Sequence, residues 1–546
     1  MSGLSIETAI ISALVVVVTV AVFVRRINLP YTIALVVMGL VLSVVPAFPT
    51  FELTREVILL VFLPPLLFEA SFNLEFESLT KNLTAILLLA VPGVVLGAFM
   101  IAGMLNLTLG RSFETMLVFG ALIAATDPIS VLAIFSRLGA PQRLATIVEG
   151  ESLFNDGVAI VLYGVVLVGA TGGSTSISGG LIEFVKVSAG GGLVGLLIAM
   201  LATALLHRID DHLIEITITT VVAFGSYLVS EQFHVSGVIG VVVAGLVMGR
   251  ARDAAMSPTT RVTLGSFWEY VGFLGNSMIF LLVGMRIAVP QLLHNLPAIA
   301  LVMLAVLLSR TVIVSLVNLV LRPFRQHMPW TWLPVVAWGG LRGAVALALA
   351  LSLPDNLPGR DWIQLMTFGV VLISLLVQGI TMQPLLNLLK LGQPKQAEYE
   401  RHQARLYALN RALHMLQREE GRGSLLPGVI SDVRDDYEAA IRAEQEDLEA
   451  IEMQPGLFRE QQIRQTRRRG LLIQRSALLD LRRQGQLSAD ALRELLEDVD
   501  AELVQLDELP KSSDDDEQQR DEKEDRDFKD SAEAERSVHG ATARTD

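Results

Sequence analysis

The chain has 546 residues, of which 52% are apolar and only 18% are charged, which excludes an ordinary soluble domain of this length and predicts a membrane protein. Residues 391–546 hold 24 Lys and Arg against 36 Asp and Glu, a net charge of −12 out of −13 for the chain, so the first 390 residues are almost neutral. The chain has no cysteine, which excludes disulfides and thiol-based metal or redox chemistry.

Apolar segments long enough to cross a bilayer recur along the first 390 residues. The N-terminus lacks the basic start of a secretory signal, so the first apolar run is predicted to be a retained span. The sequence therefore predicts an all-α polytopic membrane protein with about 13 transmembrane helices. The expected spans lie near residues 6–24, 28–48, 54–72, 82–107, 113–136, 145–171, 180–207, 212–232, 234–249, 264–289, 295–321, 330–353 and 362–389.

The loops between these spans predict the orientation of the chain. If the first loop is cytoplasmic, the loops on that side hold twelve Lys and Arg and those on the other side hold three. Because Lys and Arg accumulate in cytoplasmic loops, we expect the N-terminus outside and the C-terminal tail inside the cell. The expected location is the inner (plasma) membrane.

The composition changes beyond the last span. Residues 391–510 carry apolar residues at helical spacing, such as Leu492 and Leu496, which predicts a cytosolic helical region. Residues 511–546 are too acidic to bury an apolar core and are predicted to be disordered. Residues 1–390 form the predicted transmembrane domain.

Two predicted spans are interrupted near the middle of the membrane. In the fifth, Asp127 precedes Pro128, and proline removes a helix hydrogen bond. In the twelfth, three glycines surround Arg342, which favours unwinding. At 1.5 Å per residue, Asp127 and Arg342 lie roughly 21 and 18 Å deep. Such paired breaks in spans of opposite direction indicate an inverted-repeat transporter whose site lies where the broken helices meet.

The sixth span carries the densest polar patch, with Asp156 roughly 16 Å deep. Ser152 and Asp156 share a helix face, so they offer oxygen ligands to a small cation, completed by the carbonyl of Thr126 in the broken fifth span. Glu151 points elsewhere and is assigned to an ion pair with Arg342, because an unpaired buried charge is heavily penalised.

Three more buried charges have less defined roles. Asp127 either binds the ion or offsets the positive N-terminal ends of the half-helices, and the second role is favoured by its position at the break. Glu69 lies just after a proline pair. It is either a carboxylate that supports the cation ligands without touching the ion, or a group that reaches water at the cytoplasmic end of its span. No partner is assigned to Arg310.

Four motifs resemble the signatures of the type-1 monovalent cation/proton antiporters, the group of NhaP and the eukaryotic sodium/proton exchangers. They cover residues 63–69, 126–128, 151–157 and 339–345 in the family's order. The resemblance extends over about residues 1–390. It implies a six-helix core domain with two crossed discontinuous helices, a dimerisation domain formed by the other spans, and a homodimer.

The resemblance also implies residue roles. Asp156 is the carboxylate for cation and proton, Asn155 is its neighbour, and Ser152 and Thr126 are further ligands. Asp127 lies at the helix crossing. The remaining implied feature is a core ion pair between Glu151 and Arg342. Electrogenic members have a second aspartate where this chain has Asn155, so the resemblance implies electroneutral exchange.

The predicted function is exchange of sodium or lithium for protons by alternating access, without a cofactor or a nucleic-acid partner. A potassium/proton antiporter of the same fold is the first alternative, since oxygen ligands alone do not fix the cavity size. A gated cation channel is less favoured because the sequence lacks pore loops. Zinc-ligand, phosphate-loop and nucleophile motifs are also absent, which disfavours an enzyme.

Overall fold

The computed structural model describes two compact units, Met1–Ala397 and Glu398–Asp546. The described residues are 3–24, 30–43, 56–171, 177–209, 211–286, 289–324, 326–392, 394–421, 429–450 and parts of 467–508. The predicted disordered stretch, residues 511–546, lies outside them.

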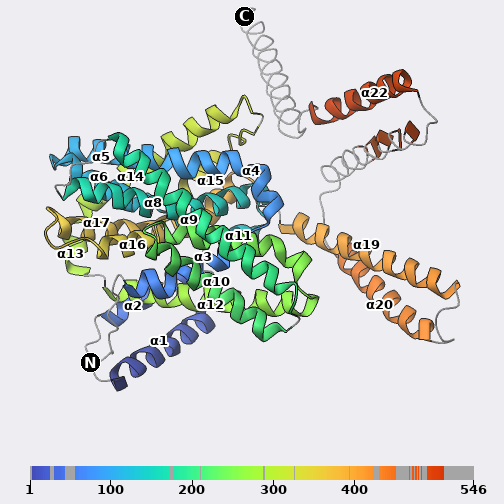
Figure 1. Cartoon of the computed structure of the whole chain (residues 1–546), viewed down its shortest axis with the longest axis horizontal. Helices are drawn as coiled ribbons and strands as arrows, with labels where there is room; N and C mark the ends of the chain where they lie inside the picture. The colour runs from blue at the N-terminus through green and yellow to red at the C-terminus, as the bar shows by residue number, and fades with distance from the viewer. Residues whose placement is uncertain are drawn as a thin grey trace, which may run out of the picture. The chain divides into compact units, whose positions relative to one another are not determined.

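All regular secondary structure in the described part of the first unit is helical (Figure 1). Its helices up to residue 206 are α1 (Gly3–Val24), α2 (Tyr31–Ser43), η1 (Val57–Phe62), α3 (Leu63–Asn73), α4 (Phe76–Leu88), η2 (Leu89–Gly93), α5 (Val94–Leu109), α6 (Phe113–Ile123), α7 (Ile129–Leu138), α8 (Gln142–Ala170) and α9 (Ile177–Leu206). The rest are α10 (His212–Gln232), α11 (Gly237–Ala255), α12 (Pro258–Arg286), α13 (Val289–His294), α14 (Leu296–Leu321), α15 (Trp332–Trp338), α16 (Ala344–Leu351), α17 (Arg360–Ile373), η3 (Ser374–Gln378) and α18 (Gly379–Leu388).

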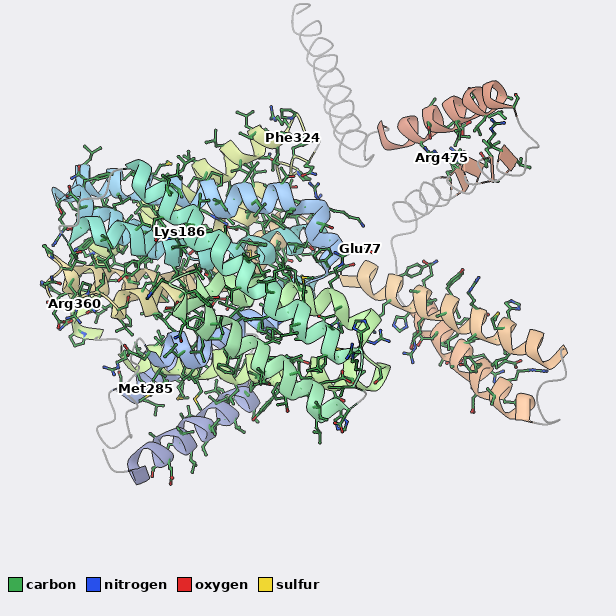
Figure 2. All side chains as sticks on the ribbon, in the orientation of Figure 1. Glu77, Lys186, Met285, Phe324, Arg360 and Arg475 are labelled. Carbon is green, nitrogen blue, oxygen red and sulfur yellow. The ribbon has the colours of Figure 1, made fainter. Side chains whose placement is uncertain are left out.

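Within the described residues, 8 helical stretches are long and apolar enough to cross a membrane. Shorter apolar helices accompany them at Tyr31–Ser43, Val57–Asn73, Phe113–Ile123 and Ile129–Leu138. The prediction of an all-helical polytopic membrane protein is therefore confirmed. Glu77 at the start of α4 and Arg360 at the start of α17 lie at opposite edges of the unit (Figure 2), as expected for charged side chains at the two ends of a membrane-spanning bundle.

The helices of this unit pack in two groups. One contains α4, α5, α6, α8, α14, α15 and α17, and the other contains α1, α2, α3, α9, α10, α11 and α12. Helix α8 contacts α9 and α11 and so lies between the groups. Small residues allow close contacts, because a Cβ on Gly195 in α9 would collide with the backbone of Gly240 in α11.

Two spans are broken, and their breaks contact each other. Helices α6 and α7 are separated by the non-helical residues 124–128, and α15 and α16 by residues 339–343. The backbone N–H of Asp127 donates to the carbonyl of Leu341 at 2.8 Å. A Cβ added to Gly343 would collide with the Cβ of Asp127, so only glycine fits at this contact.

The π-helical turn η3 supports the second break. Ser374 Oγ accepts a hydrogen bond from the backbone N–H of Arg342 at 3.2 Å. Gln378 Nε2 donates to the carbonyl of Trp338 at 2.9 Å. Because water is excluded at this depth, side chains must pair the backbone groups that the unwound segment leaves free. The wide turn of η3 is typical of functional regions in helices.

The second unit contains a helical hairpin. Helices α19 (Pro394–Gly421) and α20 (Val429–Ala450) lie side by side in Figure 1, and α22 (Ala489–Glu508) follows. His402 Nδ1 and Glu444 Oε2 lie 2.6 Å apart and join the two helices of the hairpin.

The contact at Gly343 generates a first prediction. We expect Gly343→Ala to destabilise the protein by about 1–3 kcal/mol, because overpacking moves the Asp127 side chain or the backbone. Thermal melting in detergent should show a lower Tm. Gly103→Ala in α5 is the control, since no atom lies within 4 Å of its added Cβ. Equal melting temperatures for both variants would contradict the close contact of the two breaks.

Candidate functional site

The first break is tied to α8 by side chains of the polar patch. Ser152 Oγ donates to the carbonyl of Thr126 at 2.5 Å. Asn155 Nδ2 donates to Thr126 Oγ1 at 2.6 Å, and Asn155 Oδ1 accepts from the backbone N–H of Thr126 at 3.3 Å. All three residues are buried. These hydrogen bonds hold the oxygen atoms of Thr126 and Ser152 together inside the membrane unit.

Asp156 lies one helical turn beyond Ser152 on the same face of α8. It is half-buried, and its carboxylate makes no hydrogen bond or ion pair with any residue that the structure describes. The carboxylates of Asp127 and Glu151 lie close enough to act on it electrostatically. A free carboxylate beside two neutral oxygen atoms is the kind of site that binds a small hard cation or a proton.

Glu151 pairs with Arg310 rather than Arg342, which corrects the predicted ion pair. Arg310 Nη1 and Nη2 each lie 2.6 Å from an oxygen of Glu151. Arg310 Nη2 also donates to the carbonyl of Val336 at the end of α15 (3.3 Å). The bidentate geometry aligns two charge-assisted hydrogen bonds and favours Arg310 over Arg342. Packing of α14 against α15 places this arginine beside the break.

Arg342 is a buried cation within the second break, with 4% of its surface exposed. Its Nε and Nη1 atoms have no hydrogen-bond partner in the described part of the chain. Its positive charge is repelled by Arg310 and attracted by Glu151. The residue follows the C-terminal, negative end of α15, where a cation is favourable.

Asp127 caps the half-helix that follows the first break. Its Oδ1 accepts from the backbone N–H of Ile129 in the first turn of α7, at 3.0 Å. A carboxylate at the N-terminal end of a helix offsets the partial positive charge there. The structure thus brings Asp127 to the crossing and occupies one of its oxygens with backbone.

Glu69 makes none of the hydrogen bonds that join Thr126, Ser152 and Asn155. Its Oε1 accepts from Asn73 Nδ2 at 3.0 Å, and its side chain packs on Gly272 in α12. Its carboxylate acts electrostatically on those of Glu149 and Glu269. Glu149 is seven residues before Asp156, which puts both on one face of α8, two turns apart. The seven-residue spacing in the sequence is the feature that identifies Glu149 as a second carboxylate on the Asp156 face of α8.

The Glu151–Arg310 pair generates a second prediction. We expect Arg310→Gln to destabilise the protein by about 3–5 kcal/mol, because it leaves a buried carboxylate without its partner. Adding Glu151→Gln should recover part of the loss in thermal melting experiments. Arg342→Gln is the control, and Glu151→Gln should not rescue it. If Glu151→Gln rescues only the Arg342 variant, the pairing is Glu151–Arg342 after all.

Comparisons with known proteins place this chain in a family. The relative ApNhaP of Aphanothece halophytica, a Na+/H+ antiporter, is 42% identical over 395 residues, which is 71% of this chain and 75% of that protein. The Na+/H+ antiporter NhaP of Pseudomonas aeruginosa is 37% identical over 68% of this chain and 93% of that protein.

A solved structure has the same fold. The sodium proton antiporter MjNhaP1 from Methanocaldococcus jannaschii matches with a TM-score of 0.60 and 23% identity, over 70% of this chain and 99% of that chain. The family described as sodium/hydrogen exchanger, transmembrane, matches residues 10–388. The resemblance found in the sequence is therefore confirmed, and the chain belongs to the sodium/hydrogen exchanger family.

Proposed function

We propose that this chain exchanges sodium for protons across a membrane, with Asp156 holding the cation and the proton in turn. The observation that carries the proposal is the half-buried Asp156 carboxylate, which lacks a partner among the described residues and lies on one face of α8 with Ser152. The Thr126 carbonyl and the Ser152 hydroxyl supply neutral oxygens for the sodium ion. The relatives above are Na+/H+ antiporters, which supports the choice of ions.

The charges at the crossing support exchange of one sodium for one proton. Arg310 and Arg342 bring two positive charges, and Glu151, Asp127 and Asp156 bring three negative charges. The group therefore carries a net −1 when Asp156 is free, and one monovalent cation or one proton neutralises it. An uncompensated charge is unfavourable inside a bilayer, so the empty site is disfavoured during a conformational change. Asn155 adds no second carboxylate, because its side chain is a neutral amide, and both ends of that amide bind Thr126.

Alternating access fits the packing of the helices. The group that contains α6, α8 and α15 carries the site, and α8 contacts the second group through α9 and α11. We propose that movement between the two groups opens Asp156 to each side in turn. In this proposal the short apolar helices complete about 13 spans with inverted repeats, and the second group forms a homodimer interface. The proposed orientation puts the N-terminus outside and the tail in the cytoplasm of the inner membrane.

The site generates a third prediction. We expect Asp156→Asn to abolish sodium-dependent proton movement, because the amide cannot carry a proton or balance a sodium charge. Proton flux into proteoliposomes, recorded with a pH-sensitive dye under sodium, lithium and potassium gradients, measures the exchange and its ion preference. Glu114→Gln is the control, since this carboxylate is exposed at the start of α6. Clear sodium-driven flux in a folded Asp156→Asn protein would contradict the assignment of Asp156.

The division of the chain generates a fourth prediction. Every proposed ligand precedes residue 157, and the first compact unit ends at Ala397. We propose that residues 1–390 perform the exchange and that the helical tail regulates it. A chain truncated after Pro394 should therefore retain sodium-dependent proton movement at matched protein amounts, with a changed pH dependence. A folded but inert truncated protein at every pH would assign the tail to the transport step itself.

A further inference from the structure

The hairpin of α19 and α20 brings three potential metal ligands together. His402 Nδ1 on α19 lies 2.6 Å from Glu444 Oε2 and 3.9 Å from Asp447 Oδ2 on α20. The ligand atoms of all three residues lie within 4.8 Å of one another. Glu444 and Asp447 are three residues apart, a spacing that puts both on one face of the helix. Two helices thus present one imidazole and two carboxylates to a common point.

Burial makes this group unlike ordinary surface carboxylates. The side chain of Glu444 is only 8% exposed, and that of His402 is 12% exposed. A buried carboxylate is unfavourable unless charged or hydrogen-bonding partners compensate it. Asp447 is 63% exposed and leaves the opposite side open to water. The group therefore has a fixed buried part and an accessible third ligand.

Arg405 compensates only one oxygen of Glu444. Its Nε lies 3.0 Å from Oε1, and its side chain is 70% exposed. Oε2 remains directed at His402. Together the side chains of Arg405, Glu444 and Asp447 carry a net charge of −1 beside the His402 imidazole, so the group attracts a divalent cation.

We infer that His402, Glu444 and Asp447 bind a divalent transition-metal ion that joins α19 to α20, with water as the remaining ligand. Imidazole with two carboxylates suits zinc-like ions, whereas calcium and magnesium prefer oxygen ligands alone. With zinc–ligand distances of about 2.0–2.2 Å, the metal would lie between His402 Nδ1 and Glu444 Oε2 and move these atoms slightly apart, while the imidazole carries its proton on Nε2. The site is independent of the proposed ion exchange.

The test uses the full-length protein in detergent, stripped of metal with a chelator and dialysed against Zn²⁺. We expect wild type to bind one more zinc per chain than His402→Ala, measured as protein-bound zinc by mass spectrometry. Asp447→Asn should bind zinc at least about tenfold more weakly, since even loss of an outer partner costs about 10–100-fold. His414→Ala, an exposed histidine on the same α19, is the matched control and should bind like wild type.

Two results would overturn the inference. One is equal zinc binding by wild type and Asp447→Asn, whose exposed side chain can change without removing the His402–Glu444 contact. The other is equal loss of zinc in His414→Ala. Circular dichroism confirms the helix content of each variant, and if His402→Ala loses helix, the Asp447→Asn comparison alone decides. Replacement of Zn²⁺ by Co²⁺ adds a spectroscopic readout, a visible absorption band that should weaken in Asp447→Asn.

Discussion

The membrane unit depends on one constraint, which is that backbone polar groups within a bilayer must be paired inside the protein. Two spans are unwound, and their free groups find partners in each other and in neighbouring side chains. Asp127 N–H pairs with the Leu341 carbonyl, and Ser152 and Asn155 pair with Thr126. The side chains that pair the backbone of the first break, Ser152 and Asn155, therefore come from the same turn of α8 that precedes Asp156. The same hydrogen bonds therefore stabilise the crossing and position the oxygen atoms of the proposed site.

Several charged side chains are buried at the contact of the two breaks, and most of them have a compensating partner. Glu151 and Arg310 compensate each other through two short hydrogen bonds. Asp127 is directed to the start of α7, and Arg342 stays buried beyond the end of α15. Among the carboxylates at the crossing, Asp156 alone is without such a partner within the described residues. In the proposed mechanism, the ion or the proton is that partner.

The second unit follows a different rule. Its helices are rich in charge, and the described contacts of the α19–α20 hairpin include His402, Arg405 and Glu444. A buried carboxylate in a hairpin outside the transmembrane unit is compensated by side chains from the facing helix rather than by backbone. This is why a metal site arises there from ordinary helix spacing, without the unwinding seen in the transmembrane unit.

The sequence by itself determined the all-helical membrane class, the family, the positions of both breaks and the polar patch on α8. These follow from local rules, because spanning length, proline, clustered glycine and helical spacing act within one segment. Only the tertiary structure decided that Glu151 pairs with Arg310 and that Ser374 and Gln378 support the second break. Burying Arg310 or Arg342 inside a membrane span carries a similar free-energy penalty, and no local feature of the sequence shows which of them pairs with Glu151. The choice depends on which helices pack side by side, since a bidentate ion pair requires both side chains to meet in one geometry.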